Sequence, residues 1–209
     1  MFSAFSNFDW VIILLRIPAI LLAISVHESA HAIVSDKLGD PSAKYMGRIS
    51  LNPFRHFDIL GTVMMLFLGF GFAKPVQINM RNLKHPKRDS AIIALAGPLS
   101  NLLAAIAATL LFSALSYIKG LPDVVFLFAQ IFIMLNTGLF VFNMLPIPPL
   151  DGSRIICAFL PNKIYYKLLQ YERYIMIAMF VLIFAGFFDT PLSYLNGVVY
   201  NFVISTFAF

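Results

Sequence analysis

The most chemically specific part of the sequence is a glutamate between two histidines in an apolar stretch. His27, Glu28 and His31 lie in "AISVHESAHAIVSDKLGD", residues 23–40. Because a helix turns by about 100° per residue, residues four positions apart share one face and can bind one metal ion. Zinc suits two neutral imidazoles and lowers the pKa of its bound water to ~7. Glu28, offset by about 100°, would take a proton from this water and deliver it to a leaving amine.

A second interpretation of the motif is a polar seam that holds apolar helices together, with the spacing arising by chance. The surrounding segment bears on this choice, because each ionisable group inside a membrane costs several kcal/mol unless it has a partner or a function. Three such groups lie within the five residues from His27 to His31. This density favours a catalytic metal site.

A catalytic zinc ion needs a third protein ligand besides the two histidines. The candidates are Asp36, Asp40, Asp58, Asp89, Asp151, His56 and His85. Asp151 stands apart because it follows "NMLPIPPLDG", residues 143–152, a proline-rich break where one helix ends and another can begin. An aspartate before Gly152 and an apolar run is also a normal helix N-cap, so ligand and cap remain alternatives for Asp151.

Composition indicates that these residues are held by membrane-spanning helices. The chain of 209 residues is 60% hydrophobic and 12% charged, with a mean hydropathy of +0.84, as in integral membrane proteins. The net charge of +5 is concentrated in one connection between apolar segments, which favours membrane topology over nucleic-acid binding. Cys157 is the only cysteine, so the sequence offers neither an internal disulfide nor a thiolate metal cage.

Four apolar segments are predicted to cross the bilayer, and they cover residues 10–35, 90–118, 124–144 and 174–188. The apolar tail, residues 190–209, is either a further span or a segment at the membrane surface. These segments predict an all-α polytopic membrane protein with about four to six transmembrane helices and a single domain over residues 1–209.

Residues 61–79 are predicted to form a re-entrant or hairpin segment. Gly61 to Ala73 is apolar and glycine-rich but too short to span as a helix. Such backbone lies at membrane depth only beside protein or a water-filled cavity. Pro75 to Asn79 is predicted to be a short membrane-associated β element, whose edge could hold a peptide in extended form.

Charge asymmetry predicts the orientation of the chain. Between Lys37 and Asp89 there are nine basic residues and three acidic ones, which is typical of a cytoplasmic connection. The N-terminus is then expected outside, and the His27 motif toward the cytoplasmic side of the cell membrane.

Several stretches extend the pattern along the chain, in the order "HESAHA", "SLNPFRHFDILGT", "FAKPVQIN", "AGPLSN" and "FNMLPIPPLDG". Together they resemble the site-2 protease family of intramembrane zinc metalloproteases, peptidase family M50, and specifically its small prokaryotic members. The resemblance runs from the first span to about Leu160. Ala30 and Met144 stand where many members carry Gly and Leu, and both exchanges leave the metal chemistry intact. In a chain of this length we expect no PDZ or CBS domain.

The resemblance implies one Zn²⁺ ion held by His27, His31 and Asp151, with Glu28 as the catalytic acid and base. It also implies that Asn143 lies beside the metal, where its amide could hold the substrate strand or the developing oxyanion. An interhelical hydrogen bond is the alternative role for Asn143.

Other residues match family patterns without a clear chemical role. We expect Gly97 and Asn101 of "AGPLSN" to allow close helix packing, and His56 and Asp58 to make structural hydrogen bonds rather than bind metal. His85, flanked by basic residues, is expected to be a solvated loop residue.

The resemblance implies an intramembrane zinc endopeptidase that cuts transmembrane segments of other membrane proteins, often after a first cut by another protease. The competing hypothesis is a non-catalytic polytopic protein, either a metal transporter or an inactive protease relative. Few ionisable residues lie in segments 90–118 and 174–188, which weighs against a transport path.

Overall fold

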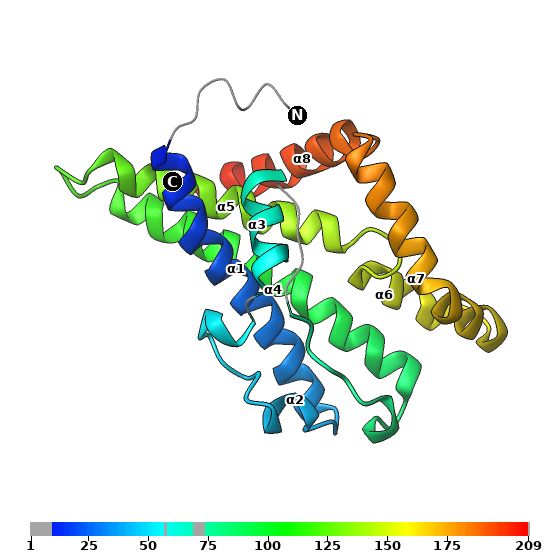
Figure 1. Ribbon diagram of the computed structural model, residues 1–209. Helices are drawn as coiled ribbons and strands as arrows, with labels where there is room; N and C mark the ends of the chain where they lie inside the picture. The colour runs from blue at the N-terminus through cyan, green and yellow to red at the C-terminus, as the bar shows by residue number, and fades with distance from the viewer. Residues whose placement is uncertain (1–9, 57, 69–73, 209) are drawn as a thin grey trace.

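The computed structural model describes residues 10–56, 58–68 and 74–208 (Figure 1). Within these ranges the chain is helical and no strand is present. The helices, including the short 3-10 helices η2 and η3, are α1 (Trp10–Lys37), α2 (Ser42–Tyr45), η2 (Pro53–Arg55), α3 (Ile59–Leu68), η3 (Met80–Asn82), α4 (Pro86–Leu115), α5 (Asp123–Asn143), α6 (Asp151–Phe159), α7 (Asn162–Phe184) and α8 (Asp189–Phe207).

Three of the described helices, α1, α4 and α5, are long and apolar enough to cross a membrane. They correspond to the predicted spans at residues 10–35, 90–118 and 124–144. The fourth predicted span, residues 174–188, falls in the longer helix α7, which begins at Asn162 and ends at Phe184. Helices α7 and α8 pass the same test only as a pair, and they are bent by 87° relative to each other. The count is therefore three spans, or four if the bent pair is one.

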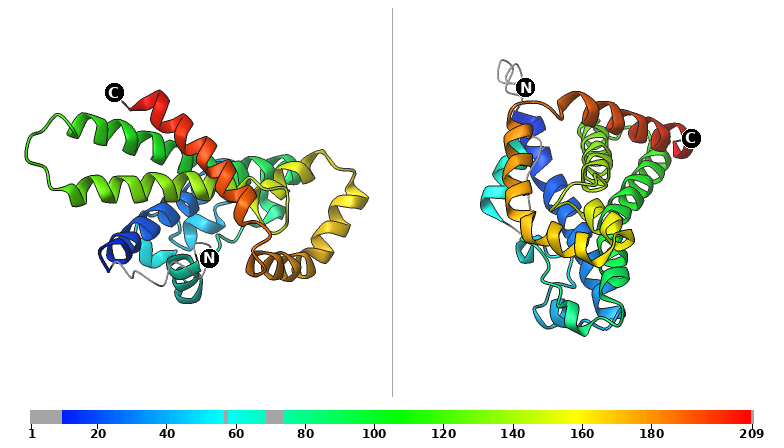
Figure 2. Two further views of the ribbon diagram at one scale, coloured as in Figure 1. Left: turned by 90° about the horizontal axis from the view of Figure 1, so that it is seen from above. Right: turned by 90° about the vertical axis from the view of Figure 1, so that its right-hand side faces the viewer.

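The core away from the candidate site lies where α4, α5 and α8 meet. Helices α4 and α5 run side by side as an antiparallel hairpin, with α8 packed across them (Figure 2). Ala105 of α4, Ile133 of α5 and Val203 of α8 are buried together, and the small alanine lets the helices approach closely. The apolar tail of the chain thus packs on this helical hairpin.

The segment predicted to be re-entrant divides into unlike parts. Residues 59–68 form α3, whose Met65 packs against Ile20 and Ile24 of α1. Residues 69–73 lie outside the described residues. Pro75 to Asn79 has no regular secondary structure, so the short β element is not formed here. A strand is defined by hydrogen bonds to a neighbouring strand, and the described part of the chain provides none.

Both ends of the segment that follows α3 are nevertheless held by hydrogen bonds. The backbone N–H of Lys74 donates to the carbonyl of His56 over 3.0 Å. The backbone N–H of Asn79 donates to the buried carboxylate of Asp40 over 2.7 Å. Residues 75–78 therefore cross between two anchored points, and this places Val76 next to α1.

Two helix contacts bring distant parts of the sequence together. Helix α1 packs against α4 and α5, and α6 packs against α4 (Figure 1). Helices α1 and α6 thereby both contact α4, although more than a hundred residues separate His31 from Asp151. This arrangement positions the candidate site.

Candidate metal centre

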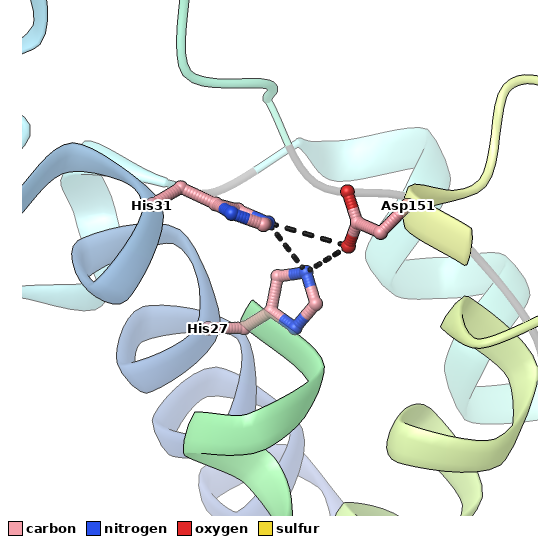
Figure 3. A group of neighbouring side chains, drawn as sticks. All are labelled: His27, His31 and Asp151. Atoms are coloured by element: carbon pink, nitrogen blue, oxygen red, sulfur yellow. Dashed lines mark hydrogen bonds and ion pairs between the residues drawn. The ribbon is translucent and has the colours of Figure 1, made fainter. Parts of the chain in front are cut away.

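His27 and His31 present their side chains from one face of α1, as their spacing predicts (Figure 3). Their Nε2 atoms are 3.0 Å apart and their rings are nearly perpendicular, at 86°. Both residues are buried. Two imidazole nitrogens therefore converge on one point within the helical bundle.

Asp151 completes this group from the other side. Its Oδ2 atom lies 3.2 Å from Nε2 of His27 and 3.3 Å from Nε2 of His31 (Figure 3). Asp151 is the first residue of α6, whose N-cap residue is Leu150. The N-cap hypothesis for Asp151 is therefore wrong, because its carboxylate points at the two histidines.

The size of this triangle fits a zinc ion. Zinc binds nitrogen and oxygen ligands at about 2.0–2.1 Å, so two ligands of a tetrahedral site are about 3.3–3.4 Å apart. The three separations here, 3.0, 3.2 and 3.3 Å, are close to that value. Two imidazoles and one carboxylate are also a ligand set found in zinc hydrolases, and they leave one tetrahedral position open. No other group of three such side chains is close enough to hold a metal in the described ranges.

Each histidine is oriented by a hydrogen bond from its other ring nitrogen. The Nδ1 atom of His31 lies 2.7 Å from the backbone carbonyl of Ile93, which can only accept. The Nδ1 atom of His27 lies 2.6 Å from Oδ1 of Asn101. Such partners orient metal-binding histidines and raise their basicity. Asn101, expected only to assist packing, thus contacts a candidate ligand.

Gly97 provides the space that the imidazoles occupy. A Cβ atom on this residue would collide with Nε2 of His31 and would lie 2.6 Å from Nε2 of His27. The expected close packing at Gly97 is confirmed. The atoms nearest to it belong to the imidazole rings of His27 and His31 on α1. A signal for Gly97 and Asn101 exists in the sequence, since residues 90–118 contain one glycine and one asparagine among mostly apolar residues.

Gly152 has a comparable role beside Asp151. A Cβ atom on Gly152 would collide with the backbone carbonyl of Met144 and would lie 2.5 Å from that of Leu145. The start of α6 can therefore pack directly onto the chain that leaves α5. This contact explains why a glycine follows Asp151: without a side chain at Gly152, the start of α6 can lie close enough to the other helices for Asp151 to reach the histidines.

Glu28 shares a cavity of about 720 Å³ with the three candidate ligands. Its side chain is mostly buried, and its Oε2 atom accepts a hydrogen bond of 3.2 Å from the backbone N–H of Val76. Val76 comes from the anchored segment after α3. The predicted β segment therefore contacts the candidate acid and base directly.

Asn143 lines the same cavity from the last turn of α5. Its Nδ2 atom donates to the carbonyl of Leu139 over 3.0 Å, within its own helix. The described contacts thus do not include the interhelical hydrogen bond considered for Asn143. One N–H group of the amide remains for another acceptor.

The rest of the cavity wall is mainly apolar and includes residues that the sequence does not single out. Met176, Met179 and Phe180 of α7 also line it. Their signal is weak, because methionine and phenylalanine are abundant throughout this chain. The candidate metal centre therefore lies in the wall of a mainly apolar cavity.

The remaining candidate ligands have structural contacts instead. His56 is buried, with Nε2 2.8 Å from the carbonyl of Ser50. Asp58 accepts a hydrogen bond of 2.9 Å from the backbone N–H of Gly61 at the start of α3. Both expected structural roles are confirmed. His85 is exposed, as expected for a solvated residue.

The other three aspartates are also engaged away from the site. Asp36 pairs with Lys44 at 3.1 Å, and Asp89 accepts from the backbone N–H of His85 at 2.8 Å. Asp40 accepts hydrogen bonds from the backbone N–H of Asn79 and from the side-chain amide of Asn82.

Comparison with known proteins places the chain in a family. The sequence model of peptidase family M50 matches residues 122–186. A Bacillus subtilis protein, YwhC, is 40% identical over 183 residues, covering 83% of this chain and 80% of the relative. The chain belongs to peptidase family M50. The residues matched by the M50 model include Asn143 and Asp151.

Two further relatives are more distant. MJ0611 of Methanocaldococcus jannaschii is 28% identical over 156 residues, covering 73% of this chain and 74% of the relative. Rip2 of Mycolicibacterium smegmatis is 29% identical over 147 residues, covering 68% of this chain and 55% of the relative. All three relatives carry the name "putative zinc metalloprotease". No solved structure matches this M50 chain.

Proposed function

We propose that this M50 protein is an intramembrane zinc endopeptidase that hydrolyses peptide bonds in or near transmembrane segments. The observation that carries the proposal is the triangle of His27, His31 and Asp151, which has the size of a zinc site and opens into the cavity that contains Glu28. The names of the relatives support the same metal and the same reaction class. We assign the three triangle residues as the ligands of one Zn²⁺ ion.

The chemistry divides between the metal and Glu28. A bound zinc ion would act as a Lewis acid toward the scissile carbonyl and would acidify a water molecule. Glu28 takes the proton of the attacking water and passes it to the leaving amine. The backbone N–H of Val76 donates to one oxygen of this carboxylate, so the other oxygen remains to accept and release the proton.

Asn143 is proposed to bind the peptide next to the bond that is cut. Its Nδ2 atom uses one N–H group on Leu139, which fixes the amide and leaves the second N–H for a carbonyl oxygen of the substrate. A fixed donor aimed at developing negative charge contributes to catalysis because no reorganisation is needed at the moment of reaction.

The substrates are proposed to be membrane proteins. The cavity wall is mainly apolar, which suits the side chains of a transmembrane segment. A helix hides its own carbonyls, so the substrate must unwind before hydrolysis. Residues 75–79, anchored at both ends and lining the cavity, offer an edge on which the unwound peptide can form a short β element.

The orientation follows from charge. The connection between α1 and α4 carries the excess of basic residues and is proposed to be cytoplasmic, with the N-terminus outside. The candidate site lies near the end of α1 that enters this connection, so cleavage is expected toward the cytoplasmic side. We propose that residues 1–209 act as a single transmembrane protease domain.

The deciding experiment compares wild type with Glu28→Gln in purified, detergent-solubilised protein. We expect both proteins to bind one zinc ion per chain, and only wild type to cleave a transmembrane model substrate. Glu172→Gln is the matched control, because Glu172 is the only other glutamate and its partner is Arg154. Unchanged cleavage by Glu28→Gln would refute the mechanism, and zinc binding without cleavage by wild type would favour a non-catalytic membrane protein.

A further inference from the structure

A chain of hydrogen bonds leads from the candidate metal centre across three helices. Nδ1 of His27 on α1 is 2.6 Å from Oδ1 of Asn101 on α4. Nδ2 of Asn101 donates to Oδ1 of Asn136 on α5 over 2.9 Å and to the carbonyl of Ala23 over 3.1 Å. Nδ2 of Asn136 donates to the carbonyl of Phe132 over 2.8 Å. Asn101 and Asn136 are both fully buried.

The direction of these bonds is set by their backbone ends. A backbone carbonyl only accepts, so the nitrogen of Asn136 must face Phe132 and its oxygen must face Asn101. Asn101 then places its nitrogen toward Asn136 and its oxygen toward His27. Because an amide oxygen cannot donate, the proton of His27 lies on Nδ1, and Nε2 keeps a lone pair for the metal.

We propose that Asn136 is a positioning residue for the metal centre: together with the carbonyl of Ala23 it holds the amide of Asn101 in one orientation and, through it, keeps the proton of His27 on Nδ1. The inference deepens the proposed zinc site and rests on it. Asn136 acts through Asn101 and not on the metal itself. His31 needs no such relay, because its Nδ1 atom already faces the backbone carbonyl of Ile93.

The location of Asn136 supports a role beyond packing. It is a polar side chain in the interior of an apolar span, where each polar group must find a partner. Its own helix satisfies only the Nδ2 atom, through Phe132. Its oxygen is satisfied by Asn101, and the same contact completes the hydrogen bonding of the Asn101 amide.

The tautomer can be measured directly in metal-free protein. The chain has only four histidines, so ¹⁵N-histidine labelling gives a simple spectrum in which His27→Ala identifies the His27 signals. We expect Nδ1 of His27 to carry a proton throughout in wild type, because its partner Oδ1 of Asn101 can only accept. Asn136→Leu, of similar shape but without an acceptor, is expected to show a fraction of His27 without a proton on Nδ1 and no change at Nδ1 of His31.

Zinc affinity provides the second measurement, by competition with a chelator. Loss of a group that orients a ligand typically weakens metal binding 10–100-fold. We expect about tenfold weaker binding for Asn136→Leu and a larger loss for Asn101→Leu. The double variant should bind zinc no more weakly than Asn101→Leu, because Asn136 acts on His27 only through Asn101. Asn136→Asp should restore affinity, since a carboxyl oxygen still accepts from Asn101.

Thr137→Val is the matched control. Thr137 is the next residue on α5 and is equally buried. Its hydroxyl donates within the helix, to the carbonyl of Met134 over 3.1 Å. This variant should keep the wild-type tautomer and zinc affinity. If Asn136→Leu does not fold, Asn136→Ala replaces it, because it adds no bulk.

A fully protonated Nδ1 of His27 together with wild-type zinc affinity in a folded Asn136→Leu protein would overturn the inference. That result would leave the proposed function standing. Failure of wild type to bind zinc would instead overturn the proposed function, so the two failures are distinguishable.

Discussion

Gly97 lies so close to His27 that a Cβ atom on the glycine would come within 2.6 Å of the imidazole Nε2 atom. The absence of a side chain at this position on α4 therefore makes room for the Nε2 atoms of the two candidate ligands on α1. We predict that Gly97→Ala weakens zinc binding roughly ten- to hundredfold, since overpacking of this kind costs about 1–3 kcal/mol. A zinc titration against a competing chelator measures the effect.

Gly197→Ala is the control for this substitution. Gly197 lies in α8, and a Cβ atom there would meet nothing within 4 Å. Zinc affinity should be unchanged in this variant. Equal affinities for the two alanine variants would contradict the role assigned to Gly97.

Asp151→Ala is predicted to abolish stoichiometric zinc binding, because it removes one of three candidate ligands and leaves two histidines. Asp123→Ala is a matched control, since Asp123 also lies in the first turn of a helix but belongs to the exposed start of α5. Metal content by mass spectrometry of the purified proteins distinguishes them. Full occupancy in a folded Asp151→Ala protein would remove Asp151 from the ligand set.

Val76→Pro is predicted to lower cleavage without changing zinc content. Proline has no N–H group, so the carboxylate of Glu28 loses its backbone donor. A hydrogen bond to a charged group contributes about 1.5–3 kcal/mol, which corresponds to roughly a ten- to hundredfold lower kcat. Gln77→Pro stiffens the same segment but keeps this donor. If the two variants lose activity equally, rigidity of the segment and not the hydrogen bond is responsible.

The buried carboxylate of Asp40 predicts a pH-dependent stability. Burial alone would raise the pKa of Asp40, but hydrogen bonds from Ser42, Asn82 and Asn79 outweigh it and lower that pKa. A lowered folded-state pKa stabilises the fold above the unfolded pKa of about 4, and this contribution is lost as pH falls through the folded value.

Asp40→Asn should therefore lower the melting temperature of metal-free protein by several degrees at pH 7, and by progressively less toward pH 3. Thermal unfolding over this pH range tests the expectation, with Asp123→Asn as a control at an exposed site. A difference between wild type and Asp40→Asn that stays constant with pH would contradict it.

The helix period is sufficient to predict that His27 and His31 face one point, because both lie on one helix. It is not sufficient for Asp151, whose cap and ligand roles differ only in where α6 docks. The roles of Asn101 and Asn136 are still harder to predict from the sequence, because they depend on how α1, α4 and α5 pack against one another. The sequence shows only that an asparagine lies in an apolar span. This identifies the residue but not the group to which it is hydrogen-bonded.

The short β element illustrates the opposite case. The residues from Pro75 to Asn79 have the composition of a strand, yet a strand needs a second one beside it. Among the described residues the segment lacks that neighbour. Its anchoring at Lys74 and Asn79 depends on His56 and Asp40, contacts that local sequence does not reveal.

The division of the triangle between α1 and α6 also has a consequence for biosynthesis. Translation produces His27 and His31 first, but the third corner arrives only after α4 and α5 have been made. A partly synthesised chain in the membrane thus lacks the complete set of candidate ligands. Because metal binding and assembly of such a site are coupled, we expect the proposed protease to become active only after its own helices have come together.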